Sequence, residues 1–152
     1  MRRLNGFSMI ELVIVVVIIG IIAAIAVPRM SRGAAGAAEG SLTANLNVLR
    51  SALDLYATEH GGAYPTAANV VGALTTYTDD TGAVSATKTG AYIYGPYVRA
   101  IPVLPVGAKK GANGIAAADA AGIGWIYVDT TGKISANTTT ETDAKGTLFS
   151  AY

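Results

Sequence analysis

The stretch RRLNGFSMIELVIVVVIIGIIAAIAVP, residues 2–28, decides how the rest of this 152-residue chain is organised. Residues 12–27 carry no charge, and Glu11 is the one acid just ahead of them. An apolar helix of about 20 residues is long enough to cross the ~30 Å hydrocarbon core of a bilayer. Arg2 and Arg3 precede the run and predict that this end stays in the cytoplasm while the rest of the chain is exported.

The composition excludes several classes of function. The net charge is only +1, so no basic surface for nucleic acid is expected. Cysteine is absent, which excludes a disulfide framework, a thiolate nucleophile and a Cys-based metal site. His60 is the only histidine, and its place on a helix face supports no Ser–His–Asp triad. Because phosphate-binding and dinucleotide motifs are also missing, we expect no enzymatic activity.

Three interpretations compete for the opening segment. A secretory signal peptide has a shorter apolar core, about 7–15 residues, and a small-residue cleavage site, which residues 23–26 supply only poorly. A plain membrane anchor explains the hydropathy but leaves Glu11 unexplained, because an acid in the bilayer core costs roughly 2.5–3.5 kcal/mol on insertion scales. The third interpretation accounts for Glu11 as well.

Gly6, Phe7 and Glu11 stand at fixed spacing ahead of the apolar run, in the order "GFSMIEL". This arrangement resembles the class III leader of type IV pilins and type II secretion pseudopilins. The resemblance implies that prepilin peptidase cuts between Gly6 and Phe7, so that residues 1–6 are a cleaved leader. It also implies that Phe7 becomes an N-methylphenylalanine and that Glu11 is the acid used in subunit assembly.

Electrostatics gives a physical reason for Glu11. Cleavage creates an α-amino group on Phe7, about one helical turn before Glu11. In a filament, the amine of an incoming subunit can pair with Glu11 of its neighbour, and a paired acid in apolar surroundings is far less costly than an unpaired one. We therefore expect Phe7 and Glu11 to set the axial register between subunits, as a single polar residue does in a coiled coil.

A helical pattern continues beyond the apolar run. Side chains recur at spacings of three and four residues, which predicts one face of an α-helix; they are Leu42, Leu46, Leu49, Leu53, Tyr56 and His60. We expect one long helix over about residues 7–60, ended by Gly61-Gly62. Its first part, 7–27, would be the transmembrane segment and later the filament core. Residues 28–152 would form the exported head.

Two positions weaken this helix. Pro28 lacks a backbone N–H and predicts a kink. Gly20 is a poor helix former. One interpretation is a kinked but continuous helix. The resemblance to pilins implies another, in which the segment between Gly20 and Pro28 loses helical order inside the assembled filament.

The head changes character, with Gly, Pro, Thr and Tyr in place of long aliphatic runs. Several short elements are expected: a helix capped by Thr66 and ending near Tyr77, a strand at 92–94, a loop at 109–124, a β-hairpin at 125–128 and 133–135, and a strand or packed tail at 148–149. The fold class is therefore α+β. The layout resembles the pilin-like fold, a long N-terminal helix packed on a small antiparallel β-sheet head.

Calcium is the one cofactor that the sequence raises. The segments LDLYATEHGGAYPT (53–66) and GWIYVDTTGKI (124–134) loosely resemble the G-type major pseudopilins, which often bind calcium in a C-terminal loop. The candidate ligands here are Asp129, Glu141 and Asp143. Calcium takes about 6–8 oxygen ligands, and these acids are spread among threonines, so solvated turn acids are the simpler interpretation. We expect no metal and no cofactor.

A further pattern in the head is Asn137-Thr138-Thr139, which matches a glycosylation acceptor. Such a pattern is frequent by chance in a Thr-rich segment.

Together these patterns predict a structural subunit of a type IV pilus-like helical filament, most closely the major pseudopilin of a type II secretion system. The alternative is the major pilin of an extracellular pilus for adhesion, motility or DNA uptake. A membrane-anchored enzyme or binding protein is a third interpretation, but no set of convergent polar residues is visible in the sequence.

The resemblance also implies partners and a location. The expected partners are further copies of the chain, prepilin peptidase, the inner-membrane platform with its assembly ATPase, minor pilins or pseudopilins, and membrane lipid; nucleic acid is not required. Before assembly the chain would cross the bacterial inner membrane once, with a cytoplasmic N-terminus. The assembled filament would be periplasmic or extracellular.

Overall fold

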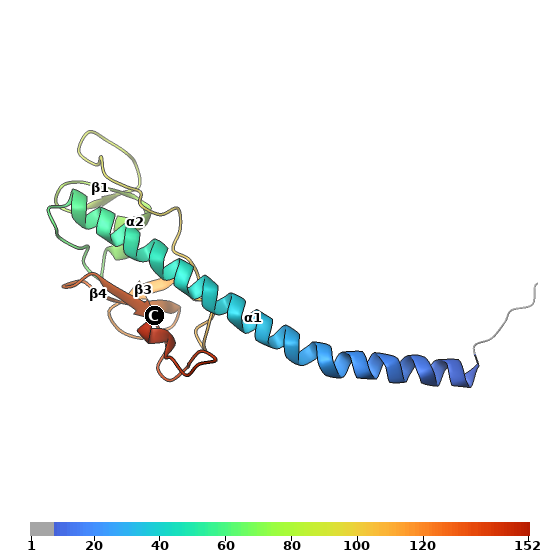
Figure 1. Cartoon of the computed structure of the whole chain (residues 1–152). Coiled ribbons are helices and arrows are strands. Elements are labelled where there is room, and N and C mark those ends of the chain that lie inside the picture. Colours follow the sequence, from blue (N-terminus) through green and yellow to red (C-terminus); the bar gives the residue numbers. More distant parts are fainter. Residues whose placement is uncertain (1–7) are drawn as a thin grey trace, which may run out of the picture. The chain divides into compact units, whose positions relative to one another are not determined.

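The computed structural model describes residues 8–152, without the side chains at 27, 28, 31 and 32, and divides after Ala37 into two compact units. Helix α1 (Met9–Glu59) begins in the first unit and ends in the second. The long helix expected over 7–60 is confirmed to within about two residues at each end, and Phe7 lies outside the described residues. The α+β fold class is confirmed as well (Figure 1).

The described part of the first unit is an exposed apolar helix. Within the described residues, the segment Met9–Ala26 of α1 is the one stretch long and apolar enough to cross a membrane, with a mean hydropathy of 3.1 and none of it buried. Its valines and isoleucines are weak helix formers in water. In lipid, however, a helix is favoured because it pairs every backbone N–H and C=O internally.

Helix α1 is continuous through both Gly20 and Pro28. A Cβ atom added at Gly20 would meet no atom within 4 Å, so packing within one copy does not require glycine there. The same is true at Gly33, Gly36 and Gly40. The structure thus has the continuous helix in the single chain, while a loss of helical order in a filament stays a prediction.

The second unit contains several short elements beside α1 (Figure 1). They are α2 (Val70–Thr75), β1 (Tyr77–Thr78), β2 (Val84–Ser85), β3 (Gly114–Ala116), β4 (Ile123–Val128), β5 (Lys133–Ala136) and the 3-10 helix η1 (Phe149–Ala151). Strands β1 and β2 form an antiparallel pair, and a second sheet has the order β3-β4-β5. The expected hairpin is confirmed as β4 and β5, which pair antiparallel. Gly132, with φ +68°, supplies the left-handed residue that its turn requires.

One hydrophobic core holds the second unit together. The predicted face of α1 lies in it, since Leu42, Leu46, Leu49, Leu53 and Tyr56 are each at most 4% exposed. Trp125, Tyr127 and Ile134 of the second sheet belong to the same cluster and are completely buried. The sheet and the helix therefore fold as one cooperative body from Ala38 onward.

The expectation for the short helix was wrong at its start. Helix α2 begins at Val70 after Asn69, and the Asn69 side chain makes no cap hydrogen bond. The Thr66 carbonyl instead accepts hydrogen bonds from the backbone N–H groups of Asn69 and Val70, which closes a turn ahead of the helix. The helix ends at Thr75 because the chain turns extended at Thr76 and enters β1.

Two of the strand predictions need correction, and one open alternative is decided. Residues 92–94 form no strand, and only Tyr94 makes an isolated bridge, to Thr78. The expected loop 109–124 contains strand β3, which pairs parallel to β4, so the second sheet is mixed rather than antiparallel. At 148–149 the structure has the packed tail, in which Leu148 bridges to Thr142 and Phe149 begins η1.

Candidate functional site

The described chain begins with a helix cap built from Ser8 and Glu11. The Ser8 backbone N–H donates to Glu11 Oε2 at 2.8 Å, and the Ile10 N–H donates to Ser8 Oγ at 3.4 Å. These reciprocal bonds form a capping box, which pairs N–H groups that the first turn of a helix leaves without partners. The Ser-x-x-Glu spacing was the sequence signal for it, and the sequence interpretation missed this role of Ser8.

Glu11 is exposed and uses only one of its oxygens in this cap. Among the described residues, the one ion pair joins Lys109 and Asp119, so Glu11 has no cationic partner there. The negative charge suits the positive end of the helix dipole. Gly6 and Phe7, the predicted cleavage and methylation sites, lie outside the described residues, so their pairing with Glu11 stays a prediction.

The apolar side chains around and after Glu11 are uncovered. Ile10 is 67% exposed and Leu12 60%. The same holds along the helix to Ile25, which is 57% exposed. Soluble monomers rarely expose a contiguous apolar surface of this size, and such a surface marks contact with lipid or another protein. A single carboxylate at the start of this surface can therefore recognise a cation in otherwise apolar surroundings.

The three calcium candidates do not come together. Within the described residues, no group of three acids or histidines is placed to hold a metal ion. Asp129 Oδ2 accepts from the Ala67 N–H at 3.3 Å. Glu141 accepts from the Ala108 N–H at 2.9 Å, and this bond is the main cause that holds the pKa of Glu141 below its usual value. Each acid fixes a different loop, so the three do not fit a shared calcium site.

Asp143 serves the C-terminal tail. Its Oδ2 accepts from the Tyr152 hydroxyl at 2.8 Å, and its Oδ1 accepts from the Lys145 and Thr147 backbone N–H groups, both at 2.8 Å. Arg50 of α1 donates to the Tyr152 backbone oxygen at 2.9 Å. The last residue is thus held through both its hydroxyl and its backbone.

We expect this tail to loosen in acid. The bond from Tyr152, ahead of the one from the Thr147 N–H, holds the pKa of Asp143 below its usual value. A carboxylate with a lowered folded-state pKa contributes stability above its unfolded pKa, and that stability is lost as the pH falls through the folded value, here below about pH 4. The amide protection factors of residues 143–152, which allow for the pH dependence of intrinsic exchange, should therefore fall in that range. In Asp143→Asn these protection factors should already be low at neutral pH, and acid-insensitive protection in the unsubstituted chain would contradict the assignment.

The glycosylation pattern at Asn137 is inaccessible in the fold. Asn137 is 6% exposed, and its amide nitrogen donates to Asp119 Oδ1 at 2.8 Å and to the Ile123 carbonyl at 2.7 Å. A glycan on this nitrogen would have to break both bonds and displace buried neighbours. The residue therefore has a structural role in the folded chain.

His60 packs at the C-terminal end of α1. Its ring stacks on Tyr56 with centroids 3.9 Å apart and planes within 4°. Its Nδ1 lies 2.9 Å from the Tyr56 carbonyl oxygen and its Nε2 lies 2.8 Å from that of Asp79. This histidine joins α1 to the turn between β1 and β2, which agrees with the packing role expected from the sequence.

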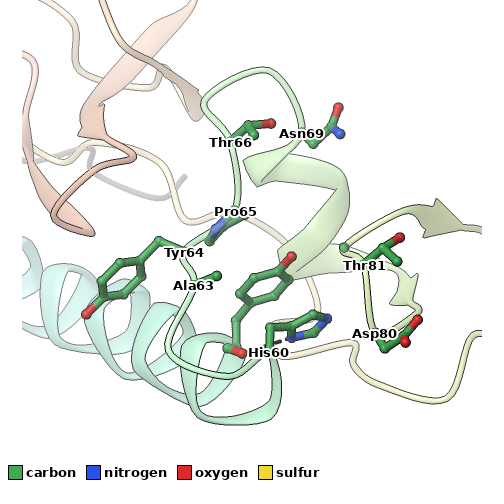
Figure 2. Close-up of a pocket in the computed structure, with 10 residues that line it drawn as sticks. His60, Ala63, Tyr64, Pro65, Thr66, Asn69, Asp80 and Thr81 are labelled. Carbon is green, nitrogen blue, oxygen red and sulfur yellow. Dashed lines mark hydrogen bonds between the residues drawn. The ribbon is translucent and has the colours of Figure 1, made fainter.

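A small cavity opens beside this histidine (Figure 2). Its volume is about 140 Å³. Three segments line it: the end of α1, the loop 63–69, and the turn 80–82. The sequence offered no signal for it, because the three segments meet only in the folded unit.

Comparison with known proteins bears on the N-terminus. A family model described as the prokaryotic N-terminal methylation motif matches residues 1–27. The match confirms the predicted leader motif at this end of the chain. No curated protein and no solved structure matches the chain. The looser G-type resemblance of the head is thus not confirmed.

Proposed function

We propose that this chain, which carries the methylation motif of type IV pilin-like and pseudopilin subunits at residues 1–27, is a structural subunit of a helical filament. Prepilin peptidase would cut between Gly6 and Phe7, and Phe7 would be N-methylated. The chain would rest in the bacterial inner membrane through the first part of α1. A separate platform and ATPase, with minor subunits, would then draw it into the filament.

The observation that carries this proposal is the pairing of that motif with an uncovered apolar helix. Met9–Ala26 has a length and hydropathy that suit lipid, and no part of the described chain covers it. Glu11 stands at its start without a cationic partner among the described residues. A membrane anchor needs only the apolar span, whereas assembly from the membrane uses both the span and Glu11. We propose no enzymatic role and no cofactor.

Within this class we propose the major pseudopilin of a type II secretion system. The absence of cysteine supports it, because many pilins of extracellular pili close a C-terminal loop with a disulfide. The second candidate is the major pilin of an extracellular pilus, which the same N-terminal motif supports equally. Deleting the gene and comparing secreted enzymes with surface fibres separates the two. Retention of enzymes in the periplasm favours the first, and loss of surface fibres favours the second.

Mass spectrometry of the mature chain tests the filament proposal itself. The expected N-terminus is N-methylated Phe7, and a strain without prepilin peptidase should retain Met1. A mature chain that begins at Met1 in a peptidase-competent strain would contradict the proposal, as would cleavage near residue 27. The measurement identifies the cleavage site directly, and the expected result is the same for a secretion filament and for an extracellular pilus.

A further inference from the structure

The ring of His60 lies between two backbone carbonyl groups that belong to different segments. Its Nδ1 is 2.9 Å from the carbonyl oxygen of Tyr56 in α1, and its Nε2 is 2.8 Å from that of Asp79 in the turn after β1. A carbonyl oxygen accepts hydrogen bonds and donates none. A neutral imidazole has one N–H group, whereas an imidazolium has two. Only the charged ring can therefore donate to both oxygens.

The surroundings of the ring favour its positive charge. The ring stacks on Tyr56 with centroids 3.9 Å apart, and a cation over the face of an aromatic ring is attracted to it. His60 directly follows Glu59, the last residue of α1, where the helix dipole attracts cations. Of the residues that the structure describes, no lysine or arginine lines the cavity beside the ring. No neighbouring cation thus opposes the imidazolium.

The other ionisable groups around His60 are phenols and carboxylates from four segments: Tyr56 and Glu59 of α1, Tyr64 of the following loop, Asp79 and Asp80 of the turn, and Tyr94 and Tyr97. Glu59 accepts from the Tyr97 hydroxyl at 2.6 Å, and the Asp79 carboxylate accepts from N–H groups of its own turn. Carboxylates titrate near pH 4 and phenols near pH 10, and burial raises the pKa of Tyr56 and Tyr97 further. Histidine is therefore the one side chain of this group that changes charge between about pH 5 and 8.

Thr78 offers the partner that a neutral ring needs. Its side chain is completely buried, and its hydroxyl oxygen lies 3.2 Å from the same Nε2 atom of His60. A protonated Nε2 donates to the Asp79 carbonyl, which is nearer at 2.8 Å. A deprotonated Nε2 can instead accept from the Thr78 hydroxyl, and its lone pair then faces the Asp79 oxygen with no proton between them. Nε2 thus has one hydrogen-bond partner for each charge state of the ring.

The turn after β1 keeps its own hydrogen bonds in both arrangements. The Gly82 N–H donates to the Asp79 carbonyl at 3.1 Å, and the Asp79 N–H donates to the Ala83 carbonyl at 3.2 Å. Neither bond involves His60. Loss of the Nε2 proton therefore weakens the attachment of this turn to α1, while the turn itself stays closed.

We propose that His60 is a pH-sensitive joint between the end of α1 and the turn 79–82. The imidazolium attaches the turn through the Asp79 carbonyl, and the neutral ring exchanges this contact for the Thr78 hydroxyl. The charged ring stabilises the fold at the acid end of the range in which histidine titrates, and this contribution is lost as the pH rises through that range. The joint lies within the second unit and does not depend on the proposed filament.

Asp79 gives the same turn a second limit at low pH. The hydrogen bond from the Thr81 hydroxyl, ahead of those from backbone N–H groups, holds the pKa of Asp79 below its usual value. A carboxylate of this kind contributes stability above its unfolded pKa, and that stability is lost as the pH falls through the folded value, here below about pH 4. The turn should therefore be attached most firmly between about pH 4 and 6.

NMR of the two ring nitrogens tests the joint on the full chain in detergent micelles. His60 is the only histidine, so its ring signals are identified without further assignment. We expect protons on both nitrogens at about pH 5 and on Nδ1 alone at about pH 8. The amide signal of Gly82, which donates to the Asp79 carbonyl, should shift with the same midpoint as the ring. A neutral ring with its proton on Nε2, or a Gly82 signal that does not follow the ring, would overturn the proposal.

A glutamine variant tests whether the joint affects stability, with unfolding followed by the fluorescence of Trp125, the only tryptophan. In the unsubstituted chain the unfolding equilibrium constant should rise about tenfold from about pH 5.5 to pH 8, because a hydrogen bond from a charged donor is lost. His60→Gln keeps an amide donor that does not titrate, so this rise should disappear. The loss of stability below about pH 4, to which Asp79 contributes, should remain. An equal rise in His60→Gln would refute the joint.

Thr78→Val tests the exchange between the two partners of Nε2. Valine keeps the branched shape of threonine but has no hydroxyl, so the neutral ring loses its alternative donor. The ring should therefore hold its Nε2 proton to a higher pH than in the unsubstituted chain. Loss of this proton at the same pH in both chains would show that Thr78 takes no part, and would contradict the proposed exchange.

Discussion

Replacement of Glu11 with alanine should leave the chain in the membrane but abolish its filaments. Membrane insertion depends on the apolar span Met9–Ala26, which the substitution does not alter. Assembly loses the one acid that can meet the amine of Phe7 in an incoming subunit. In apolar surroundings an uncompensated charge is strongly unfavourable, with about 3–5 kcal/mol lost when one partner of a buried pair is removed. Membrane fractionation and electron microscopy of sheared filaments measure the two effects separately.

Glu11→Gln is the matched variant, because it separates the charge of Glu11 from its part in the helix cap. Glutamine keeps a side-chain oxygen that can accept from the Ser8 N–H, as Glu11 Oε2 does at 2.8 Å. If the charge matters, this variant should fail to assemble as completely as Glu11→Ala. Normal filaments from Glu11→Gln would mean that the cap, and not the ion pair, is the essential role. Glu39→Gln, outside the apolar span, should assemble normally.

Trp125→Ala should cause the largest loss of stability among single substitutions in the head. Trp125 is completely buried in the core against α1, and its indole N–H donates to the Pro102 carbonyl at 2.8 Å. Removal of so large a side chain leaves a cavity and a carbonyl without its donor. Substitutions of this kind cost about 3–5 kcal/mol, a large part of the total stability of a domain of this size.

Denaturant unfolding followed by circular dichroism measures this loss, since the variant removes the only tryptophan and with it the fluorescence signal. Val128→Ala is the control on the same strand. Val128 is 42% exposed, so its truncation should change the unfolding free energy by less than about 1 kcal/mol. Similar midpoints for the two variants would show that Trp125 does not anchor the core.

The sequence was most informative where apolar side chains recur at a regular spacing over many residues. The recurrence from Leu42 to Tyr56 predicted both the helix and its buried face, because a helix in contact with a core must present apolar side chains every three or four residues. The hairpin could be predicted equally well, since two runs of β-branched and aromatic residues flank a turn that ends in Gly132. The methylation motif was recognised from a few residue types at fixed spacing, and a family model matches the same segment.

The remaining elements depend on contacts between distant residues. Strand β3 consists of Gly114, Ile115 and Ala116, a composition with little strand preference, and it exists because β4 pairs with it. Helix α2 is six residues long and begins without a side-chain cap, so no local signal marks its start. The cavity beside His60 is closed by a turn 20 residues further along the chain, as is usual for sites that tertiary structure assembles.

The uncovered span has a consequence for the energetics of the proposed filament. A span that leaves lipid and enters a fibre core of identical spans exchanges one apolar environment for another, and no apolar surface is withdrawn from water. The hydrophobic effect therefore contributes little to the direction of the exchange. Growth and dissolution of the fibre would lie near balance, so a machine that performs work at the membrane can drive either one. The subunit that returns to the bilayer is then ready to be used again.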